Sequence, residues 1–417
     1  MSHTAELIAV GTELLLGNIA NTDAQMISQG LSAVGINVFY HTVVGDNPAR
    51  LRSAVEIAKS RADIIITTGG LGPTCDDLTK QTLAESFGPP LLFDEESARR
   101  IRAFFAQLHP ERPMTDNNLQ QAMMPQGCTI FSNDWGTAPG CAFQAQGVTV
   151  LMLPGPPREC RAMFTHLALP YLQSFTDGAI VSRTLKLFGI GESAMEALLR
   201  DRMNAMTNPT LAPYAKEGET ELRITAKAPT EAQARDLIAP VEAGLRALFA
   251  DKVYGADVPS LHQVAFSLME AQGLTLGTAE SCTGGLIAQR ITDLPGASNV
   301  LKGGIVSYTD EVKHQVLGVD QDLLDRHGAV SKEVAQAMAQ GARKVLGCDL
   351  AVSTTGLAGP AGDDRGNPVG LVYIALAGPD FCHVREAHLG QGRDRIRNLA
   401  ALHAFDLIRR YLNGLRL

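Results

Sequence analysis

The sequence predicts an α/β protein in which α/β domains at both ends of the chain flank a small α+β module. Three observations predict this class. Short apolar runs alternate with amphipathic segments of helical length, which is typical of βαβ units and a parallel sheet. Glycine-rich loops follow several of these runs, and the chain contains 40 glycines. A length of 417 residues with a hydrophobic fraction of 45% suits two or three well-packed domains.

Composition excludes several classes of protein. The formal net charge of −8 argues against broad binding to nucleic acid or to anionic membranes. No apolar run is long enough to span a bilayer, and the N-terminus lacks the pattern of a signal peptide. We therefore expect a soluble cytoplasmic protein. The seven cysteines are scattered without CxxC spacing, so neither a disulfide framework nor a zinc site is indicated.

The first domain, residues 1–170, alternates strands and helices around an expected parallel sheet. Strands are expected at residues 5–10, 36–42, 63–67 and 148–153, and helices at residues 23–34 and 48–60. In such sheets ligands bind beyond the carboxyl ends of the strands. The loops that follow the strands are therefore the places to search for a site.

The loop at residues 68–79 follows the third strand and reads TGGLGPTCDDLT. Its glycines free the backbone to cradle a phosphate, and the N-terminus of the next helix adds N–H donors. Asp76 and Asp77 stand where a divalent cation could bridge to phosphate oxygens. Alternatively, the glycines only form a turn and Asp77 caps the helix. The loop matches neither GxxxxGK[ST] nor GxGxxG, which disfavours a kinase or a dehydrogenase.

Two further loops follow predicted strands of this domain. Residues 44–48 contain the carboxylate of Asp46 and also Asn47, which is a plain helix cap in the alternative interpretation. Residues 153–157, LPGPP, precede a helix with proline in its first turn. A rigid start of that helix is the alternative role of this loop.

Residues 171–253 predict a small α+β module with the element order βαββα. Strands are expected at residues 184–188 and 220–228, and helices at residues 192–203 and 230–249. The loop Gly189-Ile190-Gly191 is one residue short of the GxxG loop of an RNA-binding KH module, and basic residues do not dominate. We therefore expect a spacer or a dimer-forming module.

The third domain, residues 254–417, contains the stretch TAESCTGG at residues 278–285. A strand-like run precedes this stretch and a helical pattern follows it, so Ser281 is expected on a strand-to-helix turn. There the first N–H groups of the helix could stabilise an anion or a developing oxyanion. Such a serine is either a nucleophile or, more commonly, a helix cap. Cys282 is either functional or simply a small buried residue.

A second strand and helix start lie at residues 303–313, with Tyr308 at the end of the strand. Lys313 falls in the first turn of the helix, which Thr309 or Asp310 would cap. The helix dipole disfavours a positive charge there, so burial would lower the pKa of this lysine towards that of a general base. A solvated surface lysine is the alternative.

The rest of this domain supplies another glycine loop and a cluster of arginines. Residues 328–331 cap an alanine-rich helix, a strand at 350–354 ends in the glycine loop 355–360, and two more strands follow. The final helix begins at residue 392 with Arg393, Arg395 and Arg397. These side chains could hold a phosphate, or they could form a solvated helix face paired with Asp394.

The loops of the first domain together resemble the molybdopterin-binding-like domain of the CinA (competence/damage-inducible) family. The resemblance rests on ordered segments at residues 10–17, 21–22, 43–47, 69–79, 139–143 and 153–157. It implies a metal-dependent ADP-ribose pyrophosphatase with Mg²⁺, Mn²⁺ or Co²⁺ as cofactor. The implied phosphate-binding residues are Gly69, Gly70, Leu71, Gly72, Pro73 and Thr74. The implied metal ligands are Asp76, Asp77, Asp46 and Glu13.

The third domain resembles the nicotinamide-nucleotide amidase (PncC) domain of the same family. The matching pieces are residues 280–285, Tyr308 with Lys313, residues 328–331, 355–360 and 368–370, and Arg393 with Arg397. The resemblance implies hydrolysis of nicotinamide mononucleotide to nicotinate mononucleotide and ammonia, without a cofactor. The implied catalytic residues are Ser281, Lys313 and Tyr308. The implied substrate contacts are Glu280, Cys282, Thr283, Gly284, Gly285, Ser298, Thr355, Gly356, Arg393 and Arg397.

The resemblance covers nearly the whole chain and describes the middle module as KH-like. It implies that the partners are small nucleotides and a second copy of the chain, in a homodimer. From the net charge and the lack of a long apolar run, we expect that neither nucleic acid nor a membrane is bound. The alternative is a non-catalytic protein. Such a protein would bind a pterin cofactor or serve DNA uptake or repair.

Overall fold

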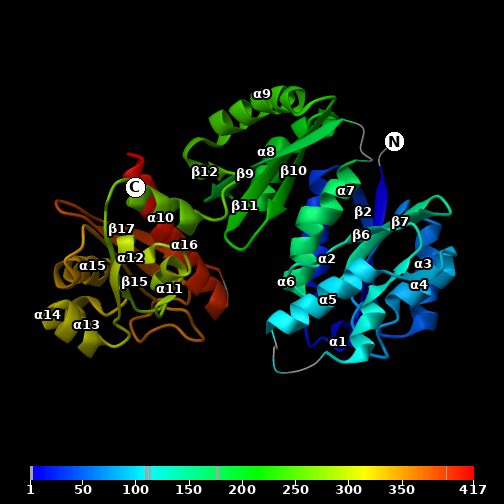
Figure 1. Ribbon diagram of the computed structural model, residues 1–417. Coiled ribbons are helices and arrows are strands. Elements are labelled where there is room, and N and C mark those ends of the chain that lie inside the picture. The colour runs from blue at the N-terminus through cyan, green and yellow to red at the C-terminus, as the bar shows by residue number, and fades with distance from the viewer. Residues whose placement is uncertain (1–2, 109–110, 112–113, 175–177, 391) are drawn as a thin grey trace. The chain divides into compact units, whose positions relative to one another are not determined.

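The computed structural model describes residues 3–108, 111, 114–174, 178–390 and 392–417. The chain forms two compact units, residues 1–181 with 227–234 and residues 182–226 with 235–417 (Figure 1). The first unit is built on a six-stranded sheet, and the second contains a five-stranded sheet and most of a four-stranded one. The structure thus has the α/β class predicted from the sequence. Among the described residues, no helix has both the length and the apolar character needed to cross a membrane.

The six-stranded sheet has the order β2-β1-β3-β8-β7-β6. Its first four strands are parallel, as expected, whereas β7 and β6 are antiparallel. The direction changes because Gln146 and Gly147 join β7 to β8 with φ of 55° and 79°, which is the geometry of a two-residue hairpin. The strands are β1 (Thr4–Val10), β2 (Asn37–Val44), β3 (Ile64–Thr68), β6 (Thr129–Phe131), β7 (Gly140–Ala145) and β8 (Val148–Leu153), and a separate pair is formed by β4 (Leu91–Phe93) and β5 (Met123–Pro125).

Helices cover both faces of this sheet because successive strand residues point to opposite faces. Leu7 packs in one cluster with Ile27 of α2, and its neighbour Ile8 packs in another with Val55 of α3. The helices are α1 (Thr12–Leu15), α2 (Thr22–Ala33), α3 (Pro48–Lys59), α4 (Thr79–Phe87), α5 (Glu95–Leu108), η1 (Asp116–Ala122), α6 (Pro157–Met163), η2 (Phe164–Ala168) and α7 (Leu169–Gln173).

The middle module forms the four-stranded sheet β10-β11-β9-β12. Its elements are β9 (Ala179–Phe188), α8 (Glu192–Ala205), β10 (Thr210–Ala215), β11 (Glu219–Ala228), α9 (Glu231–Phe249), η3 (Ala250–Lys252) and β12 (Val253–Ala256). The element order is therefore βαββαβ and not the expected βαββα. The added strand β12 is only four residues long, and such a short run shows no readable period in the sequence.

The five-stranded sheet of the C-terminal domain has the order β14-β13-β15-β16-β17. Strands β14, β13 and β15 are parallel, and β16 and β17 are antiparallel. The strands are β13 (Leu276–Glu280), β14 (Leu301–Val306), β15 (Leu350–Gly356), β16 (Leu371–Ala377) and β17 (Cys382–His388). The helices are α10 (Leu261–Ala271), α11 (Leu286–Thr292), α12 (Ala297–Val300), α13 (Asp310–Leu317), α14 (Gln321–His327), α15 (Lys332–Leu346) and α16 (Arg393–Leu412).

The two faces of this sheet have separate cores, and its strand ends define one edge. Val352 of β15 packs in a cluster with residues of α10, α11 and α16, whereas its neighbour Ala351 packs with residues of α13, α14 and α15. The parallel register pairs Glu280 with Val306 on one side and with Thr354 on the other. The loops that follow β14, β13 and β15 therefore meet at one edge of the sheet.

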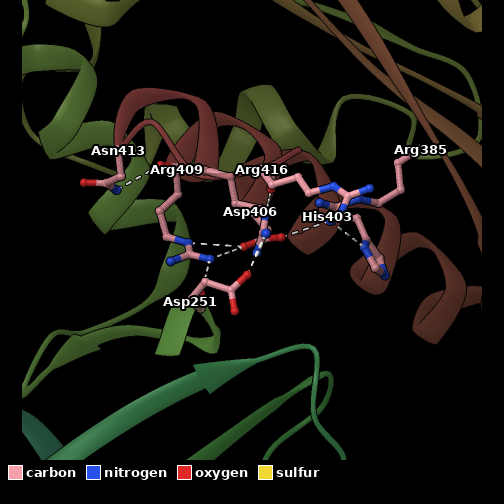
Figure 2. A network of polar contacts seen from close by, with 8 residues as sticks. Asp251, Arg385, His403, Asp406, Arg409, Asn413 and Arg416 are labelled. Carbon is pink, nitrogen blue, oxygen red and sulfur yellow. Dashed lines mark hydrogen bonds and ion pairs between the residues drawn. The ribbon is translucent and has the colours of Figure 1, made fainter. Parts of the chain in front are cut away.

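A buried ion network ties α16 to the middle module within the second unit (Figure 2). Asp406 is 3% exposed and lies between two guanidinium groups. It accepts hydrogen bonds from Arg409 at 2.6 Å and from Arg385 at 2.9 Å. Arg409 also donates to the carbonyl oxygen of Asp251 in η3 at 2.9 Å. The network fixes the end of the middle module against the last helix.

We expect His403, which lies in this network, to make the second unit less stable in acid. Its pKa falls from 6.5 to about 4 because burial disfavours the imidazolium, with Arg385 as the next cause. Between these two pKa values the unfolded chain binds more protons than the folded chain. The free energy of unfolding therefore decreases as the pH falls, by roughly 2 kcal/mol between about pH 7.5 and about pH 5. Urea denaturation at both pH values measures this loss.

The variant His403→Phe should remove that part of the pH dependence, because phenylalanine keeps the packing against Phe188 without a titrating group. The control is His388→Phe, since His388 is exposed. This control should retain the wild-type dependence. Equal slopes in all three proteins would contradict the assignment to His403.

Candidate functional site

Ser281 lies directly after β13, at the edge where the parallel strands end. Its N–H donates to the carbonyl oxygen of Thr354 on β15 at 2.9 Å, and the N–H of Ser307 donates to that of Glu280 at 2.9 Å. These bonds hold the serine between the ends of the neighbouring strands. The helix after the turn starts at Leu286, with Gly285 in the capping position and no side-chain cap. Ser281 is therefore not a helix cap.

Glu280 occupies the N–H groups that we expected to face an anion. Its carboxylate, which is fully buried, accepts from the N–H groups of Gly285 at 3.0 Å, Ile287 at 3.1 Å and Ala288 at 2.9 Å. The expectation that the first N–H groups of α11 bind a ligand is therefore wrong. A negative side chain at this place satisfies the unpaired donors and the dipole of the helix.

We expect Glu280→Gln to destabilise the protein without touching the reacting groups. The amide would present an NH₂ donor to backbone donors and leave at least one of them unpaired. The expected loss in the free energy of unfolding is about 2–4 kcal/mol, measured by urea denaturation. The control is Glu386→Gln, because Glu386 is an exposed glutamate that pairs with His388 at the surface. This substitution should change the free energy of unfolding by less than about 0.5 kcal/mol. A similarly small change at Glu280 would show that the carboxylate is not a structural cap.

The backbone N–H groups of Cys282 and Thr283 lie beside Ser281, and both also face the Cys282 sulfur, where they act on the pKa of its thiol. Within the described residues, the N–H groups of Cys282 and Thr283 donate to no oxygen atom. Gly284 and Gly285 have φ of 61° and 95°, which only glycine adopts readily, and these angles turn the chain from the strand into the helix. The N–H groups of Cys282 and Thr283 are thus the two donors of this turn that have no oxygen acceptor among the described residues.

Lys313 is buried at the start of α13, which follows β14 at the same edge of the sheet as Ser281. It is 1% exposed, so it is not the surface lysine of the alternative interpretation. Thr309 caps the helix, as expected, by accepting from the N–H of Val312 at 3.4 Å. The Lys313 Nζ donates to the carboxylate of Asp310 at 3.3 Å and to the Tyr308 carbonyl oxygen at 3.5 Å. Within the described residues it makes no hydrogen bond to Ser281.

The arginines at the start of α16 reach the same edge. Arg397 donates to the carbonyl oxygen of Thr283 at 3.0 Å. Arg393 donates to the hydroxyl of Tyr308 at 3.1 Å and to the carbonyl oxygen of Gly359 at 3.0 Å. The structure thus brings the serine turn, the end of β14, the second glycine loop and both arginines together.

Three further predicted residues at this edge are held by the protein itself. The hydroxyl of Thr355 is buried and donates to the carbonyl oxygen of Ala329 at 2.6 Å. A side chain on Gly356 would meet the Leu371 carbonyl oxygen at 2.6 Å, so glycine lets β15 and β16 approach each other. Burial raises the pKa of the Cys282 thiol to about 11. Cys282 therefore stays protonated at neutral pH and cannot compete with Ser281 as a thiolate nucleophile.

Ser298 lies at the other end of the strands. It belongs to α12, which directly precedes β14, and β14 runs parallel to β13. Ser281 follows the carboxyl end of β13, so a strand length separates the two serines. The structure does not bring Ser298 to the set of residues around Ser281.

The N-terminal unit has a separate cavity of about 450 Å³ beyond the carboxyl ends of its parallel strands. Loops after four strands line it. The predicted residues that it brings together are Glu13, Asp46, Gly69, Gly70, Leu71, Gly72, Thr74, Asp76 and Asp77. The proline loop, residues 154–157, also lines the cavity. Three other polar lining residues, Gln121, Thr137 and Glu159, were not predicted.

The glycine loop after β3 presents free N–H groups to this cavity. Within the described residues, the N–H groups of Gly70, Leu71 and Gly72 donate no hydrogen bond. Gly69 and Gly70 have φ of 92° and 67°, and a side chain on Gly69 would meet the carbonyl oxygen of Val10 at 2.2 Å. Successive unpaired N–H groups in such a turn form an anion-binding concavity.

The carboxylates of the cavity hold its loops in place. Asp77 accepts from the N–H of Thr74 at 2.9 Å, and Asp46 accepts from the N–H of Thr12 at 2.9 Å. The Thr74 hydroxyl donates to Asp76 and is the main cause that lowers the pKa of that carboxyl. The lowered pKa keeps Asp76 available as an oxygen ligand, and Asp77 lines the same cavity.

These carboxylates do not form a complete metal cage. In the part of the chain that the structure describes, no three His, Cys, Asp or Glu side chains are grouped as ligands for one ion. Magnesium is often held by one or two carboxylates together with substrate phosphates and water. Asp76 and Asp77 are two carboxylates of the kind that would hold such a cation if a bound diphosphate supplied further oxygen atoms.

The sequence contains a signal that could have identified Glu159 as a residue of the cavity. Glu159 lies in the first turn of α6, directly after the proline loop, where a carboxylate could have been suspected. Burial raises its pKa, and the amide of Asn133 donates to it at 2.6 Å. Gln121 comes from η1, some 40 residues beyond the glycine loop, and no sequence signal connects it with the cavity.

Fold and sites together define a class of protein: a multidomain α/β chain with a molybdopterin-binding-like domain, a KH-like module and a C-terminal α/β domain. Residues 6–174 match the family described as "Probable molybdopterin binding domain". Residues 182–255 match "Damage-inducible protein CinA KH domain", and residues 259–412 match "CinA C-terminal domain". The chain belongs to the CinA family.

Full-length relatives support this membership. A "Putative competence-damage inducible protein" of Acetivibrio thermocellus is 47% identical over 412 residues, which cover 99% of each chain. A "CinA-like protein" of Dictyoglomus turgidum is 46% identical over 98% of this chain and 99% of its own. Among solved structures, a competence/damage inducible protein of Agrobacterium tumefaciens is 38% identical, covers 37% of this chain and 93% of its own, and has a TM-score of 0.35.

Proposed function

We propose that the C-terminal domain is an amidase that hydrolyses nicotinamide mononucleotide to nicotinate mononucleotide and ammonia. The observation that carries this proposal is the turn after β13. There Ser281 stands beside two backbone N–H groups without an oxygen acceptor, on the same edge as the buried Lys313. A nucleophile, a base and oxyanion donors are the groups that acyl transfer requires.

In the proposed reaction, Ser281 Oγ attacks the carboxamide carbon and its proton passes to the Nζ of Lys313, which acts as the neutral amine. The N–H groups of Cys282 and Thr283 stabilise the resulting oxyanion. The C–N bond then breaks, and ammonia leaves with a proton from Lys313 or Tyr308. Water then attacks the acyl carbon and gives a proton to Lys313 Nζ. The bond from this carbon to Ser281 Oγ breaks, Lys313 returns the proton to Ser281, and nicotinate mononucleotide is released. The serine and lysine close to hydrogen-bond distance in the substrate complex, as catalytic pairs often do.

The arginines at the start of α16 suit the phosphate of this substrate. Guanidinium groups bind phosphate through paired N–H donors. Arg393 donates one hydrogen bond to a backbone carbonyl oxygen of the second glycine loop, and Arg397 donates one to a backbone carbonyl oxygen of the serine turn. Their remaining N–H donors would bind the phosphate of a nucleotide held between these loops.

We propose a second activity for the N-terminal domain, the hydrolysis of ADP-ribose at its diphosphate. Three unpaired N–H groups on the glycine loop support this proposal, because they suit the oxygens of a diphosphate. Asp76 and Asp77 would hold a divalent cation, Mg²⁺, Mn²⁺ or Co²⁺, which would supply Lewis-acid polarisation when bound. The amidase would use no cofactor.

One experiment tests both activities of the purified chain. Nicotinamide mononucleotide is incubated without metal, and ADP-ribose is incubated with each of the three divalent cations. Ammonia release measures the first reaction, and chromatography of AMP and ribose 5-phosphate measures the second. Absence of ammonia contradicts the amidase, and absence of AMP with every cation contradicts the pyrophosphatase.

The competing function is that of a non-catalytic protein in competence or DNA repair. The net charge of −8 disfavours direct contact with DNA. We also propose that the chain is a homodimer and that its ligands are small nucleotides. Light scattering would measure the molar mass and thus test the dimer. Tight, salt-sensitive binding of duplex DNA, together with no turnover of either nucleotide, would favour the accessory function.

A further inference from the structure

The segment η1 supports the glycine loop of the N-terminal cavity from outside the predicted motifs. The side chain of Gln120 donates to the carbonyl oxygens of Gly72 at 3.3 Å and of Thr74 at 3.1 Å. The side chain of Asn117 donates to the carbonyl oxygen of Pro73 at 3.1 Å. These bonds bind the carbonyl groups of the loop on the η1 side and leave N–H groups of the loop free for a ligand.

Gln121, the next residue of η1, makes no such hydrogen bond through its side-chain oxygen within the described part of the chain. Its backbone carbonyl oxygen accepts from the ammonium of Lys80 at 2.5 Å, which fixes its main chain. Its side chain is 1% exposed and lines the cavity. The carboxamide oxygen is buried and has no hydrogen-bond partner among the described residues. Buried polar atoms are nearly always paired, so an unpaired one beside a cavity calls for a ligand.

We propose that Gln121 is a specificity-determining residue, whose carboxamide oxygen accepts a hydrogen bond from a sugar hydroxyl attached to the bound diphosphate. The partner must be a donor, because the oxygen is an acceptor. Phosphate oxygens and the ionised Asp76 carry no proton at neutral pH, so neither supplies it. In a sugar diphosphate the hydroxyl groups are the donors nearest to the phosphates. This inference rests on the proposed diphosphate site and adds the group that the site recognises beside it.

The test compares two matched ligands. One is α,β-methylene ADP-ribose, whose P–C–P bridge resists cleavage, and the other is methylenediphosphonate, which has the same bridge without a sugar. Binding to the full chain is measured by titration calorimetry with Mg²⁺. Gln121→Met, which has nearly the same shape and no carbonyl oxygen, should raise the Kd for the sugar ligand about tenfold or more. The Kd for methylenediphosphonate should change less than about twofold.

Gln120→Met is the control for a merely structural effect. Loss of its bonds to the loop should weaken both ligands by the same factor. The melting temperature gives a second readout, because removing an unpaired buried oxygen should leave Tm unchanged or raise it. A fall in Tm for Gln121→Met, or an equal effect on both ligands, would overturn the inference. If the wild-type chain binds neither ligand, the proposed diphosphate site itself is wrong.

Discussion

Replacement of Ser281 by alanine is expected to lower the release of ammonia from nicotinamide mononucleotide by about 10³-fold or more. The reason is chemical, since the thiol next to Ser281 cannot take its place as a nucleophile. The Cys282 thiol, next in sequence, has a pKa of about 11 and stays protonated. The coupled measurement of ammonia over a range of substrate concentrations separates kcat from KM. The loss should fall on kcat, because the side chain acts on the reacting carbon.

The same preparation supplies the control for this prediction. Ser281 and the N-terminal cavity belong to different compact units, so the variant should still cleave ADP-ribose at the wild-type rate. Its urea denaturation should also match the wild type, since no hydrogen bond of the described protein depends on the Ser281 hydroxyl. Wild-type turnover of nicotinamide mononucleotide by Ser281→Ala would show that another group is the nucleophile.

The double variant Asp76→Asn with Asp77→Asn is expected to lower metal-dependent cleavage of ADP-ribose by about 10²- to 10⁴-fold. Asparagine keeps an acceptor oxygen for the Thr74 N–H, which Asp77 now binds at 2.9 Å, so the loop should persist. The two negative charges that attract a divalent cation would be lost. Chromatography of AMP at several metal concentrations measures the effect.

Asp63→Asn is the matched control for charge, because Asp63 directly precedes β3 and thus lies at the opposite end of that strand. This control should cleave ADP-ribose as the wild type does. Deamidation of nicotinamide mononucleotide should be unchanged in both variants. If the double variant retains full cleavage, these two carboxylates do not hold the cation.

Much of the fold follows from local patterns. The run before Gly11, the alternation at Leu222 and Ile224, and the caps at Asn47, Thr309 and Ser331 predict elements that the structure confirms. Each of these signals depends on a few neighbouring residues, such as the period of apolar side chains or an oxygen that accepts from a helix N–H. Such interactions form whatever the rest of the chain does.

The burial of Lys313 is a property that local sequence patterns do not predict. Its place in the first turn of α13 follows from the cap at Thr309, but a lysine in a helix is usually solvated. Only the packing of α13 against the sheet at Leu317 makes it a buried residue. Likewise the distance between Ser281 and Ser298 in sequence does not tell which end of the sheet each occupies. The parallel direction of β13 and β14 decides that.

The sequence by itself determined most of the strands and helices around the two sites, the loops at the strand ends and the two regions where chemistry is concentrated. The tertiary structure decided which polar groups in those regions are free. Glu280 takes the N–H groups of α11 and leaves those of Cys282 and Thr283, and η1 brings Gln121 to the glycine loop. The physical reason is that a hydrogen-bonding group is free or used according to every neighbour that folding places around it, and most of these neighbours are distant in sequence.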